Sequence, residues 1–125
     1  MRMMQMACLG VFVLVGCGGK STDEGLAQLR DKDSAQRLHA IKELREKKSE
    51  AGAVVPALAQ ALGDEDAFVR RDAARALGGF GATASSALPA LRVAAKDRNA
   101  HVRQAATEAI RQIAPDTSPL EGGKR

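Results

Sequence analysis

The chain has 125 residues, of which 45% are hydrophobic and 27% are charged, and it contains three Phe but no Trp or Tyr. This length allows one small domain or a short repeat array. The scarcity of aromatic rings argues against base-stacking nucleic-acid binders and aromatic cages. The formal charge of +4 is modest, so we expect no nucleic-acid partner. Cys8 and Cys17 are the only cysteines, which excludes a disulfide framework or a cysteine-based zinc site after residue 20.

Residues 1–16 have the features of a signal peptide. Arg2 supplies a positive charge, and an apolar run follows from Met6 to Val15. This run is too short for a membrane-spanning helix, which needs roughly 20 residues. The segment Leu14-Val15-Gly16-Cys17 resembles the lipobox of bacterial lipoproteins, in which the cysteine is acylated and becomes the first mature residue.

The lipobox resemblance implies a lipid anchor on Cys17 and a location at the bacterial cell membrane. Two or three acyl chains, palmitate among them, would hold a protein there stably. Gly18 stands where many lipoproteins retained at the inner membrane have Asp, which favours the outer membrane, facing the periplasm. An ordinary secretory signal or a short buried apolar segment are the alternatives.

Two polar segments flank the rest of the chain. Residues 17–22 are rich in Gly and polar residues, and they predict a flexible tether. Residues 115–125 contain Pro, Gly and Ser without apolar periodicity, and they predict a disordered tail.

Between the tether and the tail the sequence repeats with a step of 33 residues. Asp31, Asp64 and Asp97 are separated by this step, and matching residue types recur at several further positions without any insertion. The further sets are Asp33, Asp66 and Asn99; Arg37, Arg70 and Arg103; Ala40, Ala73 and Ala106; and Leu44, Leu77 and Ile110. The step predicts three units, at about residues 23–47, 50–81 and 83–114.

Each unit is predicted to form two helices, because apolar residues recur at three- and four-residue steps. Asp33, Asp66 and Asn99 stand at the expected N-cap of the second helix. Gly78, Gly79 and Gly81 are expected to end that helix in the second unit. One helix pair is too thin to bury its apolar face, so stacking the pairs is expected to form one continuous core. The predicted fold is an all-α solenoid.

The segment from Pro56 through Leu62-Gly63-Asp64 to Val69-Arg70 and Leu77-Gly78 resembles a HEAT repeat. It is most similar to the short, alanine-rich type found in phycobilisome lyases. Residues 83–114 carry the same pattern, and residues 23–47 are a degenerate copy. The resemblance implies that the proline-bearing helices form the convex side and the Val-Arg helices form the concave side.

Six charged residues follow the repeat most regularly: Asp31, Arg37, Asp64, Arg70, Asp97 and Arg103. The family pattern implies a ladder of Asp–Arg hydrogen bonds between neighbouring repeats. The alternative is a row of anion-binding guanidinium groups.

A second set of residues predicts a partner-binding surface. Lys42 and Arg75 occupy equivalent positions, as do Arg45 and Arg111, so these cations are expected to align across successive helices. The full set comprises Lys42, Arg45, Phe68, Arg71, Arg75 and Arg111. It would suit an acidic protein segment or anionic head groups, although a merely solvated helix face is the alternative.

Two phenylalanines have different expected roles. Phe68, aligned with Ala35 and His101, is expected to pack under a loop, with a partner contact as the alternative. Phe80 is expected in the core.

No catalytic constellation is present in the sequence. His39 and His101 are the only imidazoles, and they occupy non-equivalent positions. No nucleophile–base set, phosphate loop or clustered carboxylate pair is found, so we expect no enzyme, cofactor or metal.

The sequence therefore predicts a lipid-anchored HEAT-repeat scaffold or adaptor that binds an envelope protein. The alternative is an assembly factor that docks end-on against a larger complex, through a last stacking surface near Ile110 and Ile113. A periplasmic enzyme is a third alternative, which a bound metal or cofactor would revive. The partner and the oligomeric state stay open.

Overall fold

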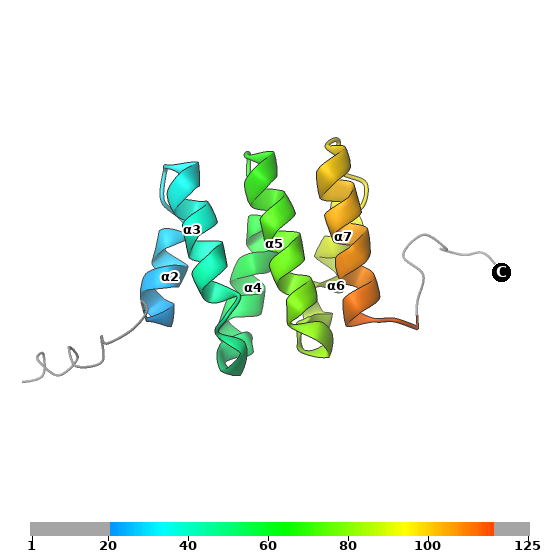
Figure 1. The fold of residues 1–125 in the computed structure, drawn as a ribbon, viewed down its shortest axis with the longest axis horizontal. Helices are drawn as coiled ribbons and strands as arrows, with labels where there is room; N and C mark the ends of the chain where they lie inside the picture. The colour runs from blue at the N-terminus through cyan, green and yellow to red at the C-terminus, as the bar shows by residue number, and fades with distance from the viewer. Residues whose placement is uncertain (1–20, 117–125) are drawn as a thin grey trace, which may run out of the picture.

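The computed structural model describes residues 21–116, and these residues are helical with short connections. In Figure 1 the helices form two layers, with α3, α5 and α7 on one side and α2, α4 and α6 on the other. The first layer comprises α3 (Ser34–Leu44), α5 (Ala67–Gly79) and α7 (Ala100–Ile113). The second comprises α2 (Thr22–Gln28), α4 (Ala51–Ala61) and α6 (Leu88–Ala94), with short 3-10 helices at η2 (Lys48–Glu50) and η3 (Gly81–Ala87).

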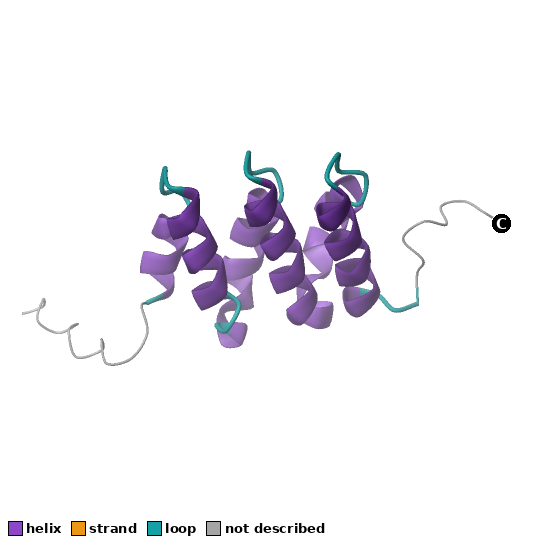
Figure 2. Cartoon of the chain, turned by 45° about the horizontal axis from the view of Figure 1, so that its top comes forward, coloured by secondary structure: helices purple, strands orange, loops and turns teal. Residues whose placement is uncertain are grey.

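The fold is thus the predicted all-α solenoid of three helix pairs. Figure 2 shows the three loops that lead into α3, α5 and α7 at one edge of the molecule. The expected signal peptide, Cys17 and most of the expected tether and tail lie outside the described residues. Ser21 and Thr22, which we expected in the tether, instead form the N-cap and the first residue of α2, because the Ser21 hydroxyl accepts a hydrogen bond from the Glu24 N–H at 3.2 Å.

Side-chain caps fix the start of each helix in the first layer, as predicted. Asp33 accepts from the N–H of Ala35, and Asp66 accepts from Phe68 and Val69. Asn99 does the same for His101 and Val102 at the start of α7. Each cap satisfies donors that have no partner inside the helix, so the three helices start at equivalent positions in the repeat.

One continuous core lies between the two layers. Leu44, Leu77 and Ile110, which are 33 residues apart, are fully buried, and so are Leu58 and Leu91 of the second layer. Alanines fill the space between neighbouring helices, which lets the helices approach closely. Ile110 and Ile113 belong to this core with 0% and 5% exposure. Our placement of them on an exposed stacking surface is therefore wrong, since α7 turns them toward the second layer.

The glycines after Leu77 end α5 partly as predicted. Gly79 is the last residue of the helix, and Gly81, which follows the C-cap Phe80, has a positive φ of 61°. Gly78 instead lies inside the helix. Gly78 is needed for a close approach of α5 to α7, since a Cβ there would lie 3.1 Å from the Ala109 Cα.

Candidate functional site

Two bidentate ion pairs join the three repeats at the loop edge. The Arg37 Nε and Nη2 donate to the Asp64 carboxylate at 2.8 and 3.0 Å. Arg70 repeats this geometry with Asp97 at the same two distances. The guanidinium fork matches a carboxylate, so each pair fixes both the spacing and the rotation of adjacent repeats.

The third nitrogen of each guanidinium is held by its own repeat. The Arg37 Nη1 donates to the carbonyls of Asp31 and Lys32 at 2.7 and 3.1 Å. The Arg70 Nη1 donates to the carbonyls of Asp64 and Glu65 at 2.8 and 3.2 Å. These two carbonyls orient each fork toward the following repeat before the carboxylate is bound.

The ion pairs also shift the pKa values of the side chains that form them. The hydrogen bond from Arg70, opposed by burial and assisted by the Asn99 N–H, lowers the pKa of Asp97. The same bond raises the pKa of Arg70 above its ordinary value. Arg37 and Arg70 are 7% and 6% exposed, so their charges are engaged inside the ladder. A surface pocket of about 410 Å³ beside this edge is lined by the same groups, including Arg70 and Asp97.

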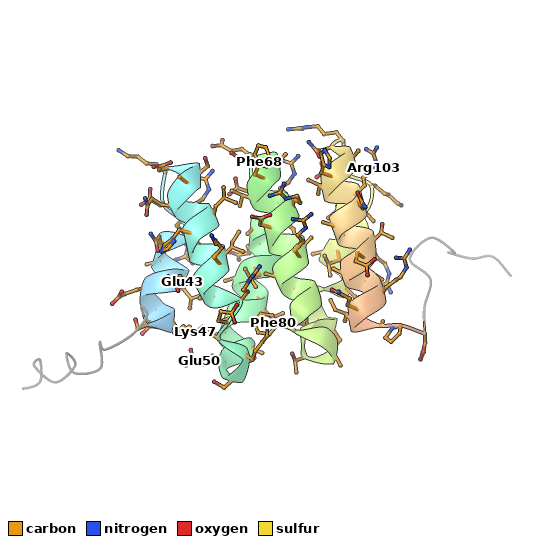
Figure 3. The ribbon with its side chains drawn as sticks, viewed as in Figure 1. Glu43, Lys47, Glu50, Phe68, Phe80 and Arg103 are labelled. Atoms are coloured by element: carbon orange, nitrogen blue, oxygen red, sulfur yellow. The ribbon has the colours of Figure 1, made fainter. Side chains whose placement is uncertain are left out.

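Within residues 21–116, the ladder is open at both ends. Arg103 is exposed, and the described part of the chain offers its Nε and Nη2 no carboxylate, although its Nη1 donates to the carbonyls of Asp97 and Arg98 at 2.8 and 3.2 Å. At the other end, one Asp31 oxygen accepts from the Asp33 N–H at 2.8 Å, and no arginine pairs with it within residues 21–116. Figure 3 places Arg103 near the loop edge of α7.

The cations predicted to bind a partner lie along the layer of α3, α5 and α7, which we call the α3–α5–α7 face. Lys42 and Arg75 are exposed, and within residues 21–116 no carboxylate pairs with either. Arg45 and Arg111 are exposed but neutralised locally, by Glu46 at 3.3 Å and Glu108 at 2.9 Å. The cations therefore share a face without converging on one point.

A pocket of about 240 Å³ lies between α5 and α7 on this face. Arg75 lines it from α5, and His101, Gln104, Glu108 and Gln112 line it from α7. Sequence reasoning missed the α7 residues as a site because they share no motif. Their helical spacing places them on one side of α7, and that was the available signal.

Phe68 is 60% exposed, so the prediction that it packs under a loop is wrong. It lies one residue past the start of α5, and the Arg71 guanidinium lies over its ring at 5.1 Å from the centroid. Arg71 also contacts Asp72 at 2.8 Å, so its charge is partly offset. Phe80 is buried as predicted, and the Lys48 ammonium lies 4.7 Å from its ring centroid.

Metal-binding clusters and membrane-spanning helices are both absent from the part of the chain that the structure describes. Residues 21–116 contain no group of three or more His, Cys, Asp or Glu side chains placed to hold a metal ion. Within the same range, every helix is too short or too polar to cross a membrane.

The family model for HEAT repeats matches residues 22–111, so the chain belongs to the HEAT-repeat family. Among solved structures, the complex of CpcE and CpcF of phycocyanin lyase from Nostoc sp. PCC7120 is similar, with a TM-score of 0.69 and 28% identity. The match covers 80% of this chain and 41% of that chain, so this chain spans less than half of its length. The comparison with curated proteins gave no match.

Proposed function

We propose that this protein is a non-enzymatic HEAT-repeat adaptor that binds an acidic segment of a partner protein on its α3–α5–α7 face. The observation that carries the proposal concerns Lys42 and Arg75, two exposed cations at equivalent positions of adjacent helices, with which no carboxylate of residues 21–116 pairs. An extended acidic segment lying across α3 and α5 would meet both charges. The pocket beside Arg75 would admit one of its side chains.

Phe68 supplies the apolar contact that such a site needs. An exposed aromatic ring flanked by an arginine is typical of residues that dominate protein interfaces. It lies on the same helix as Arg75, two turns nearer the loop edge. The similar structure is itself a complex of two proteins, which supports an assembly role.

A photo-crosslinking amino acid at Phe68 of the full chain, expressed in a bacterium, tests this proposal. We expect discrete protein adducts that disappear when Lys42→Glu and Arg75→Glu are added. The same crosslinker at Val93, which is 73% exposed on α6 in the opposite layer, is the matched control. Lys32→Glu with Arg98→Glu is the charge-matched control, because both residues are exposed at the loop edge. Equal adducts from Phe68 and Val93, or equal loss with both charge pairs, would contradict the proposal.

We further propose that Cys17 anchors the protein by acyl chains at the bacterial envelope, a proposal supported by the lipobox-like segment Leu14-Val15-Gly16-Cys17. The test is the intact mass and membrane fractionation of the full chain beside a Cys17→Ser version. A chain that starts at Cys17 with added acyl mass, and that loses this mass in the variant, is the expected result. An unmodified chain in the cytoplasmic fraction would overturn the anchor and return cytosolic partners to consideration.

A further inference from the structure

The two ends of the Asp–Arg ladder have complementary chemistry. We propose that they bind each other, so that Arg103 of one copy pairs with Asp31 of a second copy and the solenoid continues head to tail. This interface is separate from the α3–α5–α7 face and goes beyond the proposed function.

Arg103 is already oriented as a carboxylate receptor. Its Nη1 holds the same two carbonyl positions as those of Arg37 and Arg70, at distances within about 0.1 Å of theirs. In both inner repeats, this arrangement aims Nε and Nη2 at the aspartate of the next repeat. A receptor held in advance by its own repeat loses little side-chain freedom on binding.

Asp31 is the matching ligand. Asp64 and Asp97 each accept one hydrogen bond from the N–H two residues later, at 2.9 and 2.8 Å, and present the carboxylate to the arginine. Asp31 accepts the corresponding bond from Asp33 at 2.8 Å. The carboxylate therefore has the local geometry of the two occupied rungs, but no arginine of a preceding repeat pairs with it within residues 21–116.

A second pair of charges favours the same register. The Gly78 position faces Ala109 and Gln112 of the next repeat, as the short distances from a Cβ built there show. Moving this contact one repeat along places Arg111 against the equivalent residues of a second copy, Glu43 and Glu46. This contact exchanges the present pairs within each copy, which are Arg111 with Glu108, Glu43 with His39 and Glu46 with Arg45. Arg45 occupies the same position in the first repeat, and the second repeat still stacks upon it. Arginine at this position is thus compatible with stacking.

Several positions that are apolar and buried between the inner repeats are polar at the two ends, which predicts a reversible rather than a permanent contact. At the first end, Gln36, Glu43 and Lys47 replace the buried Val69, Ala76 and Phe80. At the last end, Thr107 and Arg111 replace the buried Ala74 and Gly78. Association then depends mainly on charge pairing, so it should weaken as salt increases. Because the contact joins unlike surfaces, it adds copies successively instead of stopping at a dimer.

Sedimentation velocity of the full chain tests the proposal, with Cys17→Ser included under reducing conditions so that neither a lipid anchor nor a disulfide contributes. We expect the average mass of this parent to rise with concentration and to fall with added salt. Arg103→Gln and Asp31→Asn should each weaken association at least about tenfold, since each removes one ion of a bidentate pair. The amide that Asp31→Asn introduces retains an Oδ1 acceptor for the Asp33 N–H, so the local turn is preserved.

Mixing the two variants gives the decisive result. Arg103→Gln keeps a competent first end and Asp31→Asn keeps a competent last end. At concentrations where neither variant associates alone, an equimolar mixture should therefore form a 1:1 dimer and nothing larger. Arg98→Gln, which removes the same charge five residues away, should associate like the parent. Arg103→Lys, which keeps the charge but loses the fork, should associate more weakly than the parent and more strongly than Arg103→Gln.

A parent that stays monomeric at all concentrations would overturn the proposal, as would a mixture of variants that stays monomeric. Association unchanged by Arg103→Gln would also overturn it. Thermal unfolding of each variant serves as the folding check, and the melting temperature should match that of the parent because both residues lie at the open ends of the ladder.

Discussion

At the residue scale, the same arginine has different roles in different repeats. Arg70 is buried and bound to both Asp97 oxygens, whereas Arg103 has the same carbonyl contacts but remains exposed. The same sequence position therefore holds two repeats together in the middle of the array, and at Arg103 it keeps the carbonyl contacts without the carboxylate. Within residues 21–116, Arg70 has the aspartate of a following repeat as its partner, and Arg103 has no such partner.

Arg70→Gln is expected to destabilise the fold by about 3 kcal/mol, because it leaves the Asp97 carboxylate poorly solvated and unpaired. Arg103→Gln should cost less than about 1 kcal/mol, since its side chain is exposed and lacks a carboxylate partner in this part of the chain. Urea unfolding of the two variants measures the difference. Similar midpoints for both would show that the inter-repeat pair contributes little to stability.

The second prediction concerns acid. The pKa of Asp97 is lower in the folded protein, mainly because of the hydrogen bond from Arg70, so the folded state binds this proton less readily than the unfolded state. The resulting stabilisation is fully present above the unfolded pKa, about 4, and is lost as the pH falls through the lower folded value.

Urea midpoints measured between about pH 6 and pH 2 should therefore fall less steeply for Asp97→Asn than for the parent. Asp23→Asn, at an exposed position in α2, is the control and should leave the slope unchanged. Parallel curves for the parent and Asp97→Asn would contradict the assigned linkage.

At the element scale, helix spacing depends on small residues at defined positions. A Cβ at Gly78 would lie 3.2 Å from the Ala109 Cβ and still closer to the Gln112 side chain. The equivalent position in the first repeat is Arg45, which has room because Gly79 stands where the third repeat has Gln112. A small residue at this position therefore goes with a large side chain on the next helix, as for Gly78 and Gln112, and a large residue goes with a small one, as for Arg45 and Gly79.

Gly78→Gln is expected to destabilise the fold by about 1–3 kcal/mol through overpacking of α5 against α7. Introduced into a Gln112→Gly background, the same change should cost less, and a double-mutant cycle of urea unfolding measures that coupling. Gly52→Gln is the matched control, because a Cβ at Gly52 meets nothing within 4 Å, and it should stabilise by roughly 0.5 kcal/mol. Additive effects of the Gly78 and Gln112 changes would refute the packing explanation.

The repeat period predicted the helices of the first layer and their caps, because Asp33, Asp66 and Asn99 act locally. It did not predict the differences between α4 and α6, which share the aligned Pro56 and Pro89. Pro56 lies inside α4, whereas Pro89 lies in the first turn of α6 after the 3-10 helix η3. The positive φ at Gly81 redirects the chain there, and the spacing of the apolar residues does not predict such a turn.

The candidate site was only partly predictable for a similar reason. The 33-residue step aligned Lys42 with Arg75, since alignment along a solenoid follows from the period alone. The neutralisation of Arg111 by Glu108 and the pocket beside His101 depend on side-chain positions across two helices. The exposure of Phe68 follows from its place in the repeat, because the equivalent residues Ala35 and His101 are also exposed, and only its apolar side chain argued for burial.

At the scale of the whole molecule, the stability of a solenoid is the sum of contributions within each repeat and of contacts between neighbouring repeats. The middle repeat has neighbours on both sides, and α5 accordingly has seven buried residues. The first helix, α2, has one, Gly25. Stability should therefore decline from the centre of the array toward its first end.

Hydrogen exchange of the full chain should show this gradient, with the amides of α5 exchanging most slowly and those of α2 most rapidly. The free energy of opening should be higher for α5 than for α2 by about 2 kcal/mol or more. Ser21→Ala, which removes the α2 cap, should accelerate exchange in α2 and leave α5 unchanged. Asp66→Ala, which removes the α5 cap, should instead lower protection in all three repeats, because unfolding of the middle repeat leaves both neighbours without a stacking partner. Equal protection in α2 and α5, or an effect of Ser21→Ala that reaches α5, would mean that the three repeats open as a single unit and that the ends gain no independent freedom to bind.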